Sequence, residues 1–441
     1  MADGKITRLA GIAANVSWTS FEQILRVGLS FLVTVQVINY LGPERFGLYS
    51  YVISVVGILA PLTAFGLEQV VIRRLVEYPA DRDRLLGTTF AIRLVCGVVG
   101  FAVALAIVLI LDHGSGLRLR LTAVAGVMLL LQATDTVAFF FKAIMGAKHI
   151  ALARLVGLLT ASATTIVLLL VGSGVAAFLW MRGLEAGVTG VALLLAYRQW
   201  GGRWTSWRFD ASECRSLLKA GFPLFIASFA VMVYMRVDQL MLGQLSSEEE
   251  LGYYGVAVRL AEVLNFVPVA IVTAFYPTLV ECHQQGAEAF RRRIQGLYNL
   301  MALIGYATAV TATLAAPLGF RILFGHRYDA ALPMFNLLVW GMLFVCLGVA
   351  MNAMLTVIGR NWISAVATLV GMVVNVLLNF WLIPKLGAVG SAWATLVSYW
   401  VAAHGVFLFL PEFYPTFRMI GRAMLWPDIR LLRPGRPDKA H

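Results

Sequence analysis

The sequence predicts an all-α integral membrane protein with about twelve transmembrane helices, in two six-helix lobes that form pseudo-symmetric parallel repeats around a central cavity. Three observations lead to this prediction. The 441 residues are 60% hydrophobic and 13% charged, whereas soluble domains carry about 25% charged residues. Apolar runs recur from end to end, and a spanning helix needs roughly 20 apolar residues. In addition, two segments of the first half of the chain each resemble a segment of the second half, and the two pairs are separated by nearly the same number of residues.

The apolar runs define the helices in chain order, and a short polar or glycine-rich break follows each one. The predicted spans are 14–40, 47–71, 87–111, 120–142, 151–171, 175–197, 220–244, 252–278, 296–318, 332–357, 362–383 and 388–410. Only residues 172–174 separate the fifth span from the sixth. The first span is too long for a signal peptide, so we expect it to remain as a helix.

Basic residues predict the orientation of these helices. When basic residues close to the ends of spans are counted with the adjoining loop, 24 of the 35 Lys and Arg residues fall on the side of the N-terminus, six on the opposite side and five inside spans. Because cytoplasmic loops are enriched in Lys and Arg, both termini are expected in the cytoplasm. This asymmetry accounts for the net charge of +12 without a nucleic-acid partner.

Two segments look like copies of each other. Residues 40–61 and 244–268 each make a short outer turn and re-enter with a Gly-x-Tyr motif. Each then reaches a proline deep in the next helix, Pro61 or Pro268. Because proline removes one backbone hydrogen bond, we expect both helices to bend.

A looser second pair, 146–157 and 359–371, supports the same repeat. Six spans per half is an even number, so both halves insert in the same orientation. We therefore predict an N-terminal lobe at 1–214 and a C-terminal lobe at 215–411. A basic cytoplasmic tail follows at 412–441, expected to lie against anionic lipid or in solvent.

The sequence carries little of the chemistry that enzymes use. Its four cysteines lack zinc-site or disulfide-framework spacing, its six histidines do not cluster, and it has no Walker A motif. We therefore expect no metal, no cofactor and no enzymatic activity. The predicted outer loops are short, which argues against a membrane polysaccharide polymerase or glycosyltransferase.

Apart from Arg120, Lys142 and Arg154, which we count with the adjoining loops, eleven charged residues inside the predicted spans are the first candidates for a site. A charge at the membrane centre costs about 2.5–3.5 kcal/mol on insertion scales, so such residues usually face a polar cavity or a partner. Residues three or four apart share a helix face. The pairs with this spacing are Glu22 with Arg26, Arg182 with Glu185, and Arg259 with Glu262.

The stretch VMVYMRVDQLML, residues 231–242, carries a cation and an anion that do not share a face. Arg236 and Asp238 point about 200° apart on a helix. We expect Arg236 to face the central cavity and Asp238 to face a neighbouring helix, with Arg259 as a candidate partner. With Arg26 in the other half, Arg236 and Arg259 would then form a cationic lining for phosphate.

Other polar residues in the spans allow two interpretations. Three charges near span ends are expected to reach the membrane interface: Arg93, Glu68 and Asp135. Three amides are candidate sugar contacts or, equally, interhelical hydrogen-bonding groups: Asn352, Asn375 and Asn379. Gly183 and Gly187 form a G-x-x-x-G pair, which is typical of close packing within a helix bundle.

Three stretches resemble the polysaccharide exporters of the multidrug/oligosaccharidyl-lipid/polysaccharide (MOP) superfamily, and most of all the O-antigen type flippases. They are YLGPERFGLYSY at 40–51, the segment 236–279 that begins RVDQLMLGQL, and LGAVGSAWAT at 386–395. The resemblance covers nearly the whole chain. It implies two six-helix lobes around a V-shaped cavity. It also implies an undecaprenyl-diphosphate-linked oligosaccharide as the substrate, moved across the bacterial cytoplasmic membrane for surface polysaccharide biosynthesis.

The resemblance also implies the partners, which are the lipid-linked oligosaccharide, membrane lipids and other polysaccharide-assembly proteins. A cation-coupled multidrug extruder of the same fold is the main alternative. An extruder would need an acidic, aromatic cavity, whereas the predicted lining contains three arginines. Lipid II flippases of the superfamily usually have two further helices, which this sequence does not show.

Overall fold

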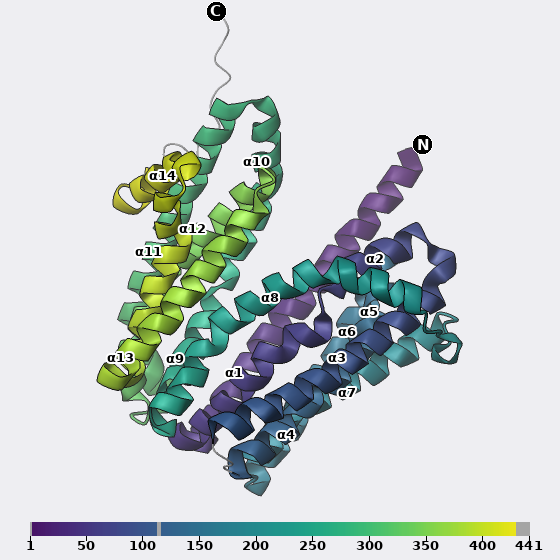
Figure 1. Cartoon of the computed structure of the whole chain (residues 1–441), viewed down its shortest axis with the longest axis horizontal. Helices are drawn as coiled ribbons and strands as arrows, with labels where there is room; N and C mark the ends of the chain where they lie inside the picture. The colour runs from purple at the N-terminus through teal and green to yellow at the C-terminus, as the bar shows by residue number, and fades with distance from the viewer. Residues whose placement is uncertain (1, 113–115, 429–441) are drawn as a thin grey trace, which may run out of the picture. The chain divides into compact units, whose positions relative to one another are not determined.

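The structure is a computed structural model that describes residues 2–112 and 116–428 (Figure 1). Its regular elements are α-helices and short 3-10 helices. The α-helices are α1 (Ala2–Ala64), α2 (Leu67–Glu77), α3 (Arg82–Leu111), α4 (Gly116–Leu131), α5 (Thr136–Ala143), α6 (Ala147–Val171), α7 (Val175–Gln199), α8 (Ala211–Leu245), α9 (Glu248–Leu264), α10 (Phe266–Gln285), α11 (Ala287–Phe324), α12 (Leu332–Val357), α13 (Asn361–Ala403) and α14 (Tyr414–Leu425).

Ten helical segments in the described part of the chain are long and apolar enough to cross a membrane. Two of them contain a glycine with non-helical angles, Gly42 in α1 (φ 71°) and Gly387 in α13 (φ 58°). Glycine adopts positive φ at little cost, so the chain can turn within one residue at each point. Counting each interrupted helix as two spans gives twelve, which confirms the predicted helix number.

The turn at Gly387 is held by a carboxylate. Glu250 Oε2 accepts a hydrogen bond of 2.9 Å from the backbone N–H of Ala388. A Cβ atom added at Gly387 would lie 2.1 Å from the same oxygen. The predicted outer loop 384–387 is therefore a tight turn that only glycine fits.

Two further spans are interrupted near the predicted prolines. α1 gives way to α2 at Phe65 and Gly66, whose φ angles are 45° and 63°, one turn after Pro61. α9 gives way to α10 at Asn265, and Pro268 lies in the first turn of α10. Both expected interruptions are present, but they fall beside the prolines and not at them.

Residue contacts divide the chain into two compact units, 1–236 and 237–441. The division lies inside α8, whereas the predicted lobe boundary at 214/215 lies near the start of the same helix. In the N-terminal unit the core forms between α2, α3, α5 and α7. Its fully buried side chains include Leu67, Leu86, Phe141 and Tyr197.

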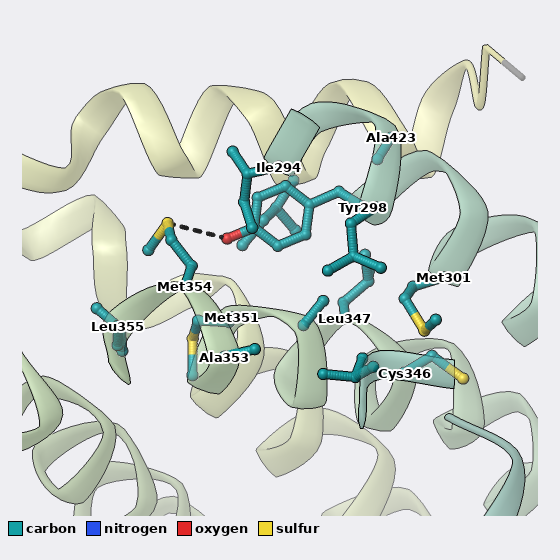
Figure 2. Packing of buried hydrophobic residues seen from close by; sticks show 14 of the residues in the cluster. Ile294, Tyr298, Met301, Cys346, Leu347, Met351, Ala353, Met354, Leu355 and Ala423 are labelled. Carbon is teal, nitrogen blue, oxygen red and sulfur yellow. Dashed lines mark hydrogen bonds between the residues drawn. The ribbon is translucent and has the colours of Figure 1, made fainter. Parts of the chain in front are cut away.

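The core of the C-terminal unit forms where α10, α11, α12 and α14 pack together (Figure 2). Tyr298 of α11 is fully buried there, and its hydroxyl lies 3.3 Å from Met354 Sδ. Ala423 belongs to the same core. Part of the predicted tail 412–441 is therefore a packed helix, α14, and residues 429–441 lie outside the described residues.

Candidate functional site

A cavity of about 1000 Å³ lies within the N-terminal unit, and we call it the unit 1 cavity. Residues of α1 to α8 line it, and the lining mixes apolar, small and charged side chains. The charged lining residues are Arg26, Glu68, Arg93, Asp135, Arg154, Arg182 and Glu185. Four arginines and three carboxylates in a predominantly apolar bundle make this the candidate site.

Arg26 connects two carboxylates on different helices. Its Nε donates to Glu22 Oε1 at 2.6 Å, and its Nη1 donates to Glu185 Oε1 at 3.1 Å. Glu185 Oε2 in turn lies 3.7 Å from Arg182 Nη1. The pairs predicted from spacing, Glu22 with Arg26 and Arg182 with Glu185, are confirmed. The contact between Arg26 and Glu185 was not predicted, because 159 residues separate them.

Arg93 corrects an expectation from the sequence. We expected it near a span end, but α3 begins eleven residues earlier, at Arg82, and Arg93 is only 4% exposed. Its Nη1 lies 3.5 Å from Thr136 Oγ1, and its guanidinium carbon lies 5.1 Å from the centre of the Phe139 ring. Its buried Nε has no hydrogen-bond partner among the described residues. Arg93 thus lines the unit 1 cavity as a buried cation with one donor that no described residue satisfies.

The acidic lining residues differ in their surroundings. Glu68 of α2 is about half exposed and forms an ion pair with Lys142. Its position at the membrane interface stays a prediction. Asp135 ends the 3-10 turn Gln132–Asp135, which interrupts the fourth predicted span. The side chain of Asp135 is partly buried and faces the same cavity as Arg93.

Asp238 belongs to a separate polar network in the C-terminal unit. Its carboxylate is 5% exposed, accepts a hydrogen bond from the Tyr254 hydroxyl, and lies 2.7 Å from the backbone nitrogen of Gln239. The Tyr254 hydroxyl also lies 3.2 Å from Thr395 Oγ1. Asp238 thus faces the neighbouring helix α9, as expected. Its pairing with Arg259 stays a prediction.

The three candidate amides fall in different environments. Asn375 and Asn379 are 1% and 0% exposed, and Asn379 Nδ2 donates to Asn375 Oδ1 at 2.9 Å. Asn375 Nδ2 lies 3.4 Å from Ser398 Oγ, across the Gly387 turn of α13. These two amides join the halves of α13 and are covered in this structure. Asn352 is exposed, and its Oδ1 accepts a hydrogen bond of 2.5 Å from Ser364 Oγ.

The remaining candidates lie outside the unit 1 cavity. Arg259 Nη1 lies 3.9 Å from Glu262 Oε2, which confirms the spacing-based pair. Arg236 is partly exposed at the division between the units and does not line the cavity. A role for Arg236, Arg259 and Glu262 in substrate binding stays a prediction.

The ten apolar helical segments define a multi-pass membrane protein, and its fold matches those of solved flippase and transporter structures. The chain is similar to a lipid II flippase, MurJ, in an inward closed conformation, with a TM-score of 0.72, 13% identity, and coverage of 94% of this chain and 91% of that chain. It is similar to an inward-facing multidrug resistance MATE family transporter, with a TM-score of 0.70 and 16% identity. That match covers 92% of this chain and 94% of the transporter. A MOP transporter from Pyrococcus furiosus matches at TM-score 0.61 and 17% identity, over 95% of each.

Sequence comparison identifies the family. The family model described as polysaccharide biosynthesis protein matches residues 12–283, and the MatE model matches residues 223–381. The first match covers more than half of the chain, so the chain belongs to the polysaccharide biosynthesis protein family, as the resemblance implied.

Two relatives match at low identity. An uncharacterized membrane protein of Methanocaldococcus jannaschii is 21% identical over 414 residues, or 88% of this chain and 81% of the relative. A "Putative O-antigen transporter" of Shigella flexneri is 24% identical over 163 residues, or 37% of this chain and 38% of the relative.

Proposed function

We propose that this protein moves an undecaprenyl-diphosphate-linked oligosaccharide across the bacterial cytoplasmic membrane, from the inner to the outer leaflet, for surface polysaccharide biosynthesis. The family match supports the link to polysaccharides, and the partial match to an O-antigen transporter supports the lipid-linked substrate. The observation that carries the proposal is the buried guanidinium of Arg93 in the lining of the unit 1 cavity, whose Nε has no hydrogen-bond partner among the described residues.

The physical task is to carry a diphosphate and several sugars past a hydrocarbon layer about 30 Å thick. The polyprenyl tail can stay in lipid while a polar cavity shields the headgroup. Guanidinium groups stay charged at physiological pH and bind phosphate oxygens through two parallel hydrogen bonds. A buried donor without an acceptor is costly, and a phosphate oxygen would satisfy the Arg93 Nε–H.

The structure changes which arginine we expect to contact the diphosphate. Arg26 already has carboxylates on two sides, Glu22 and Glu185, so much of its charge is compensated. Arg93 contacts a hydroxyl and an aromatic ring, and the carboxylates of Asp135 and Glu68 attract it without forming an ion pair with it among the described residues. We therefore place Arg93 in direct contact with phosphate, with Arg26 and Arg182 contributing at longer range.

A multidrug extruder is the second candidate, because three carboxylates also line the cavity and the MatE model matches part of the chain. Two of these carboxylates are already ion-paired, Glu185 with arginines and Glu68 with Lys142. Asp135 lies in the lining close to Arg93, whose positive charge opposes the binding of a cation there. The mixed lining therefore favours an anionic headgroup over a cationic drug.

The test uses the purified full-length protein in liposomes that contain a fluorescent undecaprenyl-diphosphate-linked oligosaccharide. An impermeant glycosidase then reports the fraction of headgroups on the outside. We expect wild-type protein to speed the equilibration of headgroups between leaflets, and Arg93→Gln to slow it at least tenfold, which corresponds to about 1.4 kcal/mol.

Arg73→Gln is the matched control, because Arg73 is an exposed arginine of the same unit outside the unit 1 cavity. Size-exclusion profiles establish that all variants are folded. Uptake of a cationic dye by the same liposomes should stay at the protein-free level. If the protein transported the dye and did not move the headgroup, the proposal would be wrong and the multidrug extruder would be the better explanation.

A further inference from the structure

Four arginines from two helices surround a second cavity, of about 430 Å³, inside the C-terminal unit. Arg291 and Arg292 come from the start of α11, and Arg418 and Arg422 lie one turn apart on α14. We call this the arginine pocket. Its lining also includes two carboxylates, of which Glu288 pairs with Arg292 at 3.4 Å. The lining thus carries an excess of positive charge.

α14 is held firmly against α11, so the four arginines are brought together by the fold. The buried face of α14, with Ile420 and Ala423, belongs to the same hydrophobic core as Ile294 and Tyr298 of α11 (Figure 2). Three α11 side chains also donate hydrogen bonds to backbone carbonyls in and after α14. They are Gln295 to Met419 at 3.1 Å, Asn299 to Asp428 at 2.9 Å, and Tyr306 to Met424 at 2.8 Å.

The arginine side chains remain accessible. All four are exposed, and the Arg418 guanidinium carbon lies 4.8 Å from the centre of the Tyr414 ring, which orients it beside the pocket. Like charges held this close repel one another unless an anion lies between them. A phosphate group is the anion that suits several guanidinium groups at once, because its oxygens accept paired hydrogen bonds.

Exposed apolar side chains lie close in sequence to the pocket residues of α14. Leu425 and Trp426, three and four residues after Arg422, are 86% and 77% exposed, and Phe409, five residues before α14, is 80% exposed. Large apolar groups next to a cationic pocket suit the membrane interface, where tryptophan is enriched and basic residues meet lipid phosphates. A soluble phosphate compound would leave these apolar side chains uncovered.

We propose that the arginine pocket binds the phosphate of an anionic phospholipid headgroup, while Leu425 and Trp426 insert beside its acyl chains. The site is separate from the unit 1 cavity and does not depend on which substrate the protein transports. The bound lipid would fasten α14 to the membrane surface.

Native mass spectrometry of the full-length protein, titrated with dioleoylphosphatidylglycerol or dioleoylphosphatidylcholine in detergent, tests this proposal. We expect wild-type protein to bind phosphatidylglycerol in preference to phosphatidylcholine. Arg418→Gln/Arg422→Gln should weaken phosphatidylglycerol binding roughly tenfold or more. Arg291→Gln/Arg292→Gln changes the other helix and should cause a similar loss, so detachment of α14 alone would not explain both results.

The matched control is Arg321→Gln/Arg327→Gln, which removes two exposed arginines near the opposite end of α11 and should leave binding unchanged. A parallel titration measures protection from thermal unfolding by inorganic phosphate. If the control variant lost phosphatidylglycerol binding equally, net charge alone would explain the effect, and the proposed site would be wrong. Protection by inorganic phosphate that depends on the pocket arginines and equals that of the lipid would overturn the lipid assignment.

Discussion

Arg26 Nη1 lies 3.1 Å from Glu185 Oε1 and joins α1 to α7 across 159 residues of sequence. The same guanidinium bonds Glu22 one turn away, and it remains one-third exposed in the lining of the unit 1 cavity. The sequence offered two alternatives for Arg26, an internal ion pair or a cation in a cavity. In the structure Arg26 has both properties.

Arg26→Gln is therefore expected to affect folding as well as transport. The variant leaves Glu22 and Glu185 without their shared cation in an apolar bundle, which should cost about 1–3 kcal/mol after allowance for partial exposure. Glu185→Gln should cost less, because Arg26 keeps Glu22. In thermal unfolding of the purified variants, Arg26→Gln/Glu185→Gln should cost less than the two single changes combined, with a coupling of about 1 kcal/mol. Strictly additive losses would mean that the contact contributes nothing.

Tyr254→Phe is expected to destabilise the C-terminal unit. Its hydroxyl donates to the buried carboxylate of Asp238, and losing that donor leaves a charge poorly solvated, at about 1–3 kcal/mol. Tyr253→Phe is the adjacent control, because its hydroxyl bonds Glu249 at an exposed position, 2.6 Å away. Thermal unfolding in detergent should show a large shift for Tyr254→Phe and almost none for Tyr253→Phe. Equal shifts in unfolding temperature for the two variants would show that the hydrogen bond to Asp238 contributes no more to stability than an exposed one.

Gly157→Ala is expected to disturb the packing of α6 on α7. A Cβ at Gly157 would lie 2.9 Å from the carbonyl oxygen of Glu185 and 2.1 Å from Thr189 Oγ1. The overpacking should cost about 1–3 kcal/mol. At Gly183, one half of the predicted G-x-x-x-G pair, the nearest heavy atoms would be 3.9 Å away. Gly183→Ala should therefore leave the unfolding temperature almost unchanged, and an equal loss in the two variants would contradict this account.

The positive-inside asymmetry predicts that both termini are cytoplasmic. Alkaline phosphatase, active only outside the cytoplasm, should be inactive when fused after Pro411. The same reporter fused after Asp112, in a predicted outer loop, should be active. Matched expression levels, measured by immunoblot, serve as the control. Activity after Pro411 would require an odd number of spans before it or an inverted orientation.

Local patterns in the sequence determined the helices and the short-range ion pairs. Apolar runs of membrane length predict spans because the backbone must satisfy its own hydrogen bonds in lipid. The pairs Glu22–Arg26, Arg182–Glu185 and Arg259–Glu262 were predictable because residues three or four apart lie on one face of any helix.

Tertiary packing alone decided which of these groups meet. Arg93 was expected at the interface, but the depth of a residue depends on where its helix begins and on what covers it. Asn375 had two equal interpretations until its burial against Ser398 favoured the interhelical bond. Arg291 and Arg418 line one pocket although more than a hundred residues separate them. No periodicity within a helix carries such information, because it arises only when distant helices pack against one another.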